Sequence, residues 1–330
     1  MIEARELRKR FRSRYAVDGL SFTVRPGQVT GFLGPNGAGK STTMRMILGL
    51  DRPTSGTVLL DDRPYTSLHR PLHQVGAVLE VRALHGGRTA YHHLLCLAQS
   101  NGIGHRRVNE VLGLVGLADV AHRRAGKFSL GMSQRLGLAA ALLGDPPILL
   151  CDEPVNGLDP DGILWIRTLL RGLAAEGRTV FVSSHLMSEM ALTADRLIVI
   201  GQGRLLAEAS TADIIAASST NYVLVRSPDI ARLSDVLHNA GAAVTPAPHA
   251  TPPGAAAADR SGHPSAGLQV TGMDCAAIGD LLAPLDIPIH ELSPHTASLE
   301  AAYMELTHDH VDFHTELPSP PENIPEGSLR

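Results

Sequence analysis

Nine consecutive residues, 34–42, constrain the fold of this chain more than any other segment. They read Gly-Pro-Asn-Gly-Ala-Gly-Lys-Ser-Thr, which fits the pattern G-x-x-x-x-G-K-[ST]. A short apolar run at 28–33 precedes them, and residues 41–50 have a helical composition. Glycines let backbone N–H groups turn inward around a polyphosphate, and the positive end of the following helix points at the same oxygens. The sequence therefore predicts a strand, a phosphate-binding loop and a helix, in that order.

The side chains of this loop have predicted tasks. Lys40 is expected to reach the β- and γ-phosphates, and the Ser41 hydroxyl is expected to take a place on Mg²⁺. The predicted contacts to the bound nucleotide are Gly34, Pro35, Asn36, Gly37, Ala38, Gly39, Lys40, Ser41 and Thr42.

A second apolar run, residues 147–152, ends in acid, as expected of a buried parallel strand. In enzymes with such a phosphate loop, a carboxylate at a strand end holds Mg²⁺, and Asp152 is assigned to that place. Glu153 is then placed to orient or deprotonate an attacking water. The two acids could instead cap the next helix, an alternative that the upstream loop makes less favoured.

Strand and helix patterns alternate over residues 1–215, which predicts an α/β fold with a mostly parallel sheet and helices on its faces. A mainly helical stretch, about 84–140, interrupts the alternation. Short strand candidates followed by helical patterns indicate a small α/β domain over 216–306. Within it, residues 244–266 are rich in Pro, Ala, Gly and His and are predicted to form a flexible insertion. Residues 307–330 are predicted to be a disordered tail.

Composition narrows the classes of function. The 330-residue chain has a formal net charge of -4, which argues against a general nucleic-acid binder. Six basic residues crowd positions 5–14, and we interpret them as a solvated strand edge rather than a phosphate- or membrane-contacting patch. The three cysteines lack the paired spacing of a disulfide framework or a zinc site. No signal peptide and no membrane-spanning stretch is predicted, so any membrane role is expected to go through a partner.

A third motif lies between the loop and the acids. Phe128-Ser129-Leu130-Gly131-Met132 stands about twenty residues before Asp152 and opens an Ala- and Leu-rich helix. This is the place of the LSGGQ-type signature in ATP-binding subunits of ABC transporters, whose pattern Ser129 and Gly131 match and Leu130 and Met132 do not. On these three motifs, the chain resembles the nucleotide-binding subunit of an ABC transporter, an ATPase with a P-loop core.

The resemblance implies roles for further residues. Ser129, Leu130, Gly131 and Met132 would contact ATP held by the opposite subunit, so two sites would form when two ATPase domains close face to face. Asp159 resembles the D-loop residue at that interface, and His185 the switch histidine that contacts the γ-phosphate. Tyr15 resembles the aromatic residue that stacks on adenine, although a plain strand-edge tyrosine remains an alternative.

One position departs from the family. Most members have a glutamine where this chain has Glu80, at the end of the segment 74–80. A carboxylate is a good neighbour for Mg²⁺ but cannot donate a hydrogen bond when ionised, so Glu80 is assigned to the metal with Ser41 and Asp152. Glu80, the signature and the C-terminal segment together resemble drug- and antibiotic-resistance exporters of the daunorubicin and bacitracin type.

We therefore expect an enzyme that binds ATP and Mg²⁺ and hydrolyses ATP through Glu153, His185 and Lys40. The expected partners are a second copy or a sister subunit, and a separate transmembrane permease at the cytoplasmic face of the membrane. The expected cargo is a drug, an antibiotic or another hydrophobic compound, and no nucleic acid is expected. Two alternatives stay open, a soluble ABC ATPase acting on ribosomes or DNA and a non-catalytic nucleotide-binding regulator.

Overall fold

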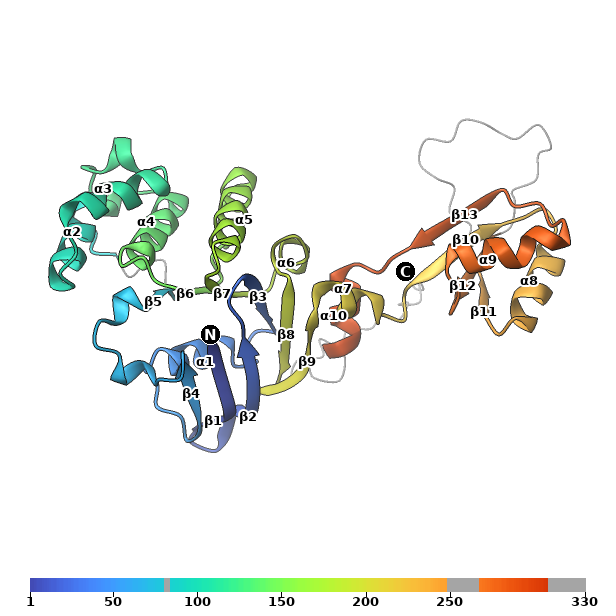
Figure 1. Ribbon diagram of the computed structural model, residues 1–330, viewed down its shortest axis with the longest axis horizontal. Helices are drawn as coiled ribbons and strands as arrows, with labels where there is room; N and C mark the ends of the chain where they lie inside the picture. Colours follow the sequence, from blue (N-terminus) through green and yellow to red (C-terminus); the bar gives the residue numbers. More distant parts are fainter. Residues whose placement is uncertain (80–83, 248–266, 308–330) are drawn as a thin grey trace, which may run out of the picture.

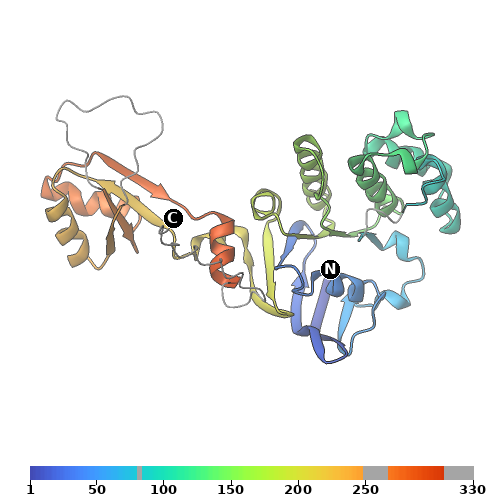
Figure 2. The same cartoon turned by 180° about the vertical axis from the view of Figure 1, so that it is seen from behind.

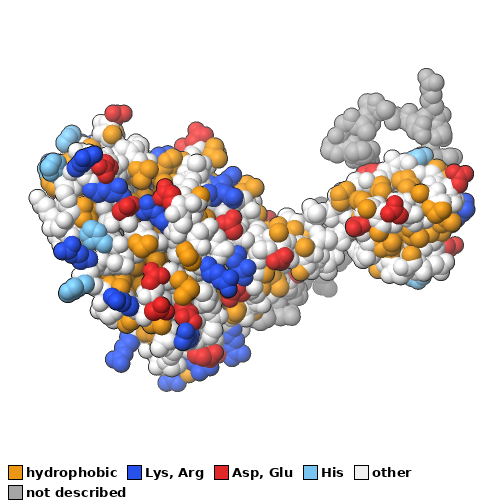
Figure 3. All heavy atoms as spheres, in the orientation of Figure 1, with side chains coloured by type: hydrophobic (Ala, Val, Ile, Leu, Met, Phe, Trp, Pro, Cys, Tyr) orange, Lys and Arg blue, Asp and Glu red, His pale blue; other side chains and the backbone are white. Residues whose placement is uncertain are grey.

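The computed structural model describes residues 1–79, 84–247 and 267–307. These residues form a large body and a small one, joined by a narrow neck (Figures 1 and 2). Hydrophobic side chains gather on the visible face of the small body, which we call the accessory unit, residues 222–247 and 267–295 (Figure 3). No helix in the described part of the chain combines the length and the apolar character that crossing a bilayer requires.

A six-stranded sheet lies at the centre of the large body. Its strands, in spatial order, are β5 (Val75–Val78), β6 (Ile148–Asp152), β7 (Thr179–Ser184), β3 (Gln28–Leu33), β8 (Arg196–Gly201) and β9 (Arg204–Ser210). The first five pair in parallel, and only β9 pairs antiparallel, with β8. The predicted α/β fold with a mostly parallel sheet is therefore confirmed. Because both faces of this sheet are covered, β7 is buried along its whole length and β8 along all but its first residue.

One face of this sheet packs against α1 (Lys40–Ile47) and a second, antiparallel sheet. That sheet has the order β2 (Arg14–Val24), β1 (Ile2–Phe11), β4 (Ser55–Leu60). Phe22, Phe32 and Phe181 meet between the layers, with ring centroids 5.1–5.8 Å apart. The basic residues at positions 5–14, which we interpret from the sequence as a solvated strand edge, lie on β1, in the turn that follows it and at the start of β2.

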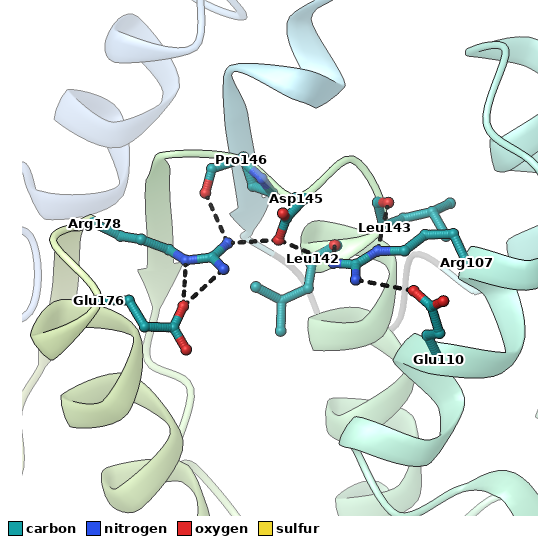
Figure 4. Close-up of polar contacts among 8 residues, drawn as sticks. All are labelled: Arg107, Glu110, Leu142, Leu143, Asp145, Pro146, Glu176 and Arg178. Carbon is teal, nitrogen blue, oxygen red and sulfur yellow. Dashed lines mark hydrogen bonds and ion pairs between the residues drawn. The ribbon is translucent and has the colours of Figure 1, made fainter.

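The opposite face packs against α5 (Pro160–Ala175), α6 (Met187–Thr193) and a helical subdomain. The subdomain contains α2 (Ala90–Ser100), α3 (His105–Leu114) and α4 (Leu130–Leu142), of which only the last two residues of α4 lie beyond the predicted helical stretch, about 84–140. Asp145 anchors it to the sheet, because its Oδ1 accepts from Arg107 at 3.1 Å and from Arg178 at 3.0 Å (Figure 4). Arg107 also donates to the carbonyls of Leu142 and Leu143 at the end of α4. The C-terminal end of α4 is thereby fixed to the sheet.

The accessory unit has the β-α-β-β-α-β order of ferredoxin-like folds. Its elements are β10 (Tyr222–Arg226), α8 (Ile230–Asn239), β11 (Ala243–Pro246), β12 (Gly267–Thr271), α9 (Cys275–Leu282) and β13 (Glu291–His295). The strands pair antiparallel in the order β11-β12-β10-β13, and α8 and α9 cover one face. The prediction that a flexible insertion starts at residue 244 is wrong for its first residues, because Val244 to Pro246 pair with β12. The rest of the predicted insertion, 248–266, lies outside the described residues.

The last helix, α10 (Leu299–Thr307), does not join the accessory unit, although its sequence position suggested that it would. Leu299, Ala302 and Tyr303 are buried in the core of the large body, where α10 contacts α6 and α7 (Thr211–Ala216). Burial raises the pKa of Tyr303 to about 12. Thr307 closes this helix, and the rest of the predicted tail, 308–330, lies outside the described residues.

The neck consists of two segments, residues 217–221 and 296–298. Glu305 of α10 accepts hydrogen bonds from Ser219 and Ser218, which lower the pKa of its carboxyl group. Asn221 donates to the carbonyls of Ile215 and Ala216 and accepts from Ala297 N at 2.7 Å. The two segments are thus tied to each other and to the large body.

Candidate nucleotide site

The loop between β3 and α1 is wrapped around the Lys40 side chain. Lys40 is 7% exposed, and its Nζ donates to the Gly34 carbonyl at 2.6 Å and to the Pro35 carbonyl at 3.4 Å. Burial lowers the pKa of Lys40, while the nearby carboxylates of Glu153 and Asp152 oppose that shift. The two backbone carbonyls compensate the Lys40 ammonium group only partly for the loss of its water. An anionic ligand would complete that compensation.

Glycine is required in this loop by backbone conformation and by space. Gly39 has φ 104°, and a Cβ there would lie 2.4 Å from the Ala16 carbonyl oxygen. This close approach places the loop against the start of β2, so Tyr15 lies at its edge with 43% of its surface exposed. The Arg10 guanidinium lies 5.9 Å from the centre of the Tyr15 ring. An exposed ring beside the loop suits the predicted stacking on adenine.

The two acids end β6 next to Ser183 of β7. Asp152 and Ser183 are register partners in these parallel strands, and the Ser183 hydroxyl donates to Asp152 Oδ1. The same hydroxyl accepts from the Glu153 N–H at 2.9 Å. Glu153 has φ 51°, an uncommon conformation for a residue with a side chain, and these contacts help to hold it.

Three predicted catalytic residues meet at the Glu153 carboxylate. His185 Nδ1 lies 2.8 Å from Glu153 Oε2, and the His185 N–H donates to the same oxygen at 3.3 Å. Lys40 Nζ lies 4.0 Å from Glu153 Oε1. The Glu153 carboxylate therefore lies between Lys40 of the phosphate loop and His185.

The signature lies at the N-terminus of α4, the Ala- and Leu-rich helix that the sequence predicted it would open. The Ser129 hydroxyl caps the helix by accepting from the Met132 N–H at 3.2 Å, and Ser129 itself is exposed. Asp159 caps α5 in the same way, accepting from the Gly162 N–H at 2.9 Å. A Cβ built on Gly157 would lie 2.2 Å from Leu130 Cδ2, so the signature and the D-loop touch within one chain.

Among the described residues, the signature does not contact the catalytic acids through a hydrogen bond or an ion pair. No hydrogen bond or ion pair among them joins residues 129–132 to Lys40, Asp152 or Glu153. Leu130 is 44% exposed although it is apolar. Leu130 and Ser129 at the N-terminus of α4 are therefore exposed on the surface of this chain.

Two of the three predicted Mg²⁺ ligands lie among the described residues. Ser41 is exposed in the first turn of α1, and Asp152 is the last residue of β6. Both side chains offer oxygen atoms, which are the ligands that Mg²⁺ prefers. Glu80, the third predicted ligand, lies outside the described residues.

Sequence reasoning did not give Ser183 a role, because its contact depends on the register of β6 and β7. We expect Ser183→Ala to lower the free energy of unfolding by about 1–3 kcal/mol, since Asp152 loses a buried donor. Turnover should fall about tenfold, since a loss of 1.4 kcal/mol in transition-state stabilisation has that effect. Chemical denaturation and steady-state phosphate release measure the two effects.

The matched control is Ser184→Ala. Ser184 is equally buried, but its hydroxyl accepts from the Leu186 N–H at 3.0 Å and contacts neither acid. Equal turnover in the two variants would contradict a positioning role for Ser183.

The chain is similar to known proteins in two segments and over most of its length. A family profile described as "ABC transporter" matches residues 17–156, and one described as a domain of unknown function (DUF8746) matches 221–300. The uncharacterized ABC transporter ATP-binding protein YhcH of Bacillus subtilis is 37% identical over 315 residues, which are 93% of this chain and 96% of that protein. The chain belongs to the ATP-binding proteins of ABC transporters.

Two further similarities agree with this assignment. The bacitracin transport ATP-binding protein BcrA of Bacillus licheniformis is 43% identical over 63% of this chain and 69% of its own length. A solved dimeric bacterial ABC transporter cassette superposes with a TM-score of 0.59 at 27% identity, covering 64% of this chain and 99% of that one. This member of the ABC family is therefore an ATP-binding ATPase subunit, and the alternatives of a ribosome- or DNA-acting ATPase and of a non-catalytic regulator are not favoured.

Proposed function

We propose that two copies of this subunit hold MgATP between them and hydrolyse it to drive export through a separate membrane permease. The observation that carries the proposal is the division of the site. Lys40, Glu153 and His185 meet at one carboxylate, whereas the capped and exposed N-terminus of α4 presents Ser129 outward. Helix N-terminal amides favour an anionic group, so a second copy could supply Ser129 to the γ-phosphate of the first.

Each residue then has a proposed task. Lys40 and the loop amides hold the β- and γ-phosphates, and Tyr15 stacks on the adenine. Glu153 takes a proton from the attacking water, and His185, in contact with Glu153, positions the γ-phosphate. Asp152 and Ser41 would hold Mg²⁺, which when bound offsets the negative charge of the phosphates.

The proposed cargo follows from relatives rather than from geometry. BcrA is named for bacitracin transport, and the lantibiotic transport ATP-binding protein SrtF of Streptococcus pyogenes is 35% identical over 63% of this chain. We infer export of an antibiotic or another hydrophobic compound, with the subunit bound to its permease at the cytoplasmic face of the membrane.

Co-expression with a candidate membrane permease tests the partnership. We expect the two to co-purify from detergent-solubilised membranes and to hydrolyse ATP faster together than the subunit does alone. Lys40→Ala serves as the control, since it should keep the complex and lose the hydrolysis. Sedimentation of the subunit with ribosomes, and not with membranes, would contradict the proposal.

A further inference from the structure

A cavity of about 640 Å³ lies at the neck, away from every residue of the nucleotide site. Ile215 and Ala216 of α7 line one side of it, and Tyr222, His295 and Met273 of the accessory unit line the other. A molecule bound there would touch both bodies at once.

The lining is mostly apolar and includes a flat aromatic surface. The rings of Tyr222 and His295 stack with centroids 4.8 Å apart and an interplanar angle of 5°. These two residues are cross-strand partners on β10 and β13, so the sheet itself holds the ring pair in place. A rigid ring surface beside apolar walls is suited to a hydrophobic or aromatic ligand.

The charge of the lining selects among such ligands. Asp274 lies at the cavity, and none of the residues that line it is a lysine or an arginine. One Asp274 oxygen caps α9 by accepting from the Ala277 N–H at 2.7 Å, and the side chain is exposed. The N-terminus of α9 carries roughly half a positive charge, which is smaller than the full negative charge of the carboxylate. The net local charge is therefore negative, and aromatic rings also attract cations.

We propose that this cavity binds a small hydrophobic cation that packs on the Tyr222–His295 ring pair and is attracted by Asp274. The cavity shares no lining residue with the candidate nucleotide site. Because its walls come from α7 and from the accessory sheet, occupancy holds the accessory unit in one position relative to the large body.

Tetraphenylphosphonium and tetraphenylborate form a matched pair of probes, since they share a shape and differ in the sign of their charge. Calorimetric titration of the full chain at about pH 8, above the ordinary titration range of imidazole, measures binding of each. We expect the cation to bind more tightly than the anion. Equal binding of the two ions, or tighter binding of the anion, would overturn the proposal.

Asp274→Asn removes the charge and keeps the helix cap, since asparagine caps as well as aspartate. It should weaken binding of the cation about two- to fivefold, which is the effect of one exposed charge, and leave the anion unaffected or bound more tightly. Asp280→Asn on the same helix is the control, because Asp280 does not line the cavity.

Ala216→Trp fills the cavity from an exposed position on α7 and should abolish binding of the cation. Tyr222→Leu, which removes the ring, should weaken it and provides a second check if the tryptophan variant does not fold. Unchanged binding in either folded variant would place the cation elsewhere and refute the site.

Discussion

Replacing Glu153 by glutamine should slow ATP turnover by about 10²–10⁴-fold, the usual contribution of a positioned general base. Glutamine has the shape of glutamate and can still accept from the His185 backbone N–H, but it cannot take a proton from water. ATP binding should persist, because the phosphate loop does not depend on this carboxylate. Single-turnover phosphate release measures the chemical step, and equilibrium titration with a fluorescent ATP analogue measures binding.

Glu176→Gln is the matched control, since Glu176 is an exposed acid at the end of α5 that pairs with Arg178. It should hydrolyse ATP at the wild-type rate. A Glu153→Gln variant with wild-type turnover would show that another group activates the water.

The second large effect is the recovery of ATPase activity when two inactive variants are mixed. Lys40→Ala removes the phosphate contact, and Ser129→Asp keeps the cap of α4 but places a negative charge where the γ-phosphate of the other copy is expected. Each alone should be inactive. Random mixing makes half of the dimers mixed, and each mixed dimer has one intact site of two, so about a quarter of wild-type activity should return.

Phosphate release from the mixed proteins measures the recovered activity. Circular dichroism of each variant is the folding control. A mixture as inactive as its components, formed from variants shown to exchange subunits, would mean that one chain completes its own site.

Local chain order made part of the site predictable. The phosphate loop was readable because its glycines and lysine stand between a strand pattern and a helix pattern, and the structure places Lys40 at the first residue of α1. Asp152 and Glu153 were readable because acids end an apolar strand. The roles of these residues remain predictions, but the structure brings Lys40, Glu153 and His185 together.

What the sequence could not supply depends on pairing between distant segments. Ser183 contacts both acids through the register of two parallel strands, which no local pattern encodes. Val244 lies in a Pro- and Ala-rich segment that composition alone describes as flexible, yet pairing with Val270 makes it a strand. The last helical pattern of the segment 216–306 did not indicate which body α10 would pack against, because apolar side chains on one helix can pack against either core.

Because α10 packs on the large body, the accessory unit is inserted between two segments of the chain that both belong to the large body. A hydrogen bond joins Asn221 to Ala297, so the chain enters and leaves the accessory unit at neighbouring positions. Inserted units with adjacent ends can be excised or exchanged without unfolding their host. A shortened gene that splices these two positions together should therefore keep the whole ATPase core, whereas a stop codon placed before α10 would strip Leu299 and Tyr303 from it.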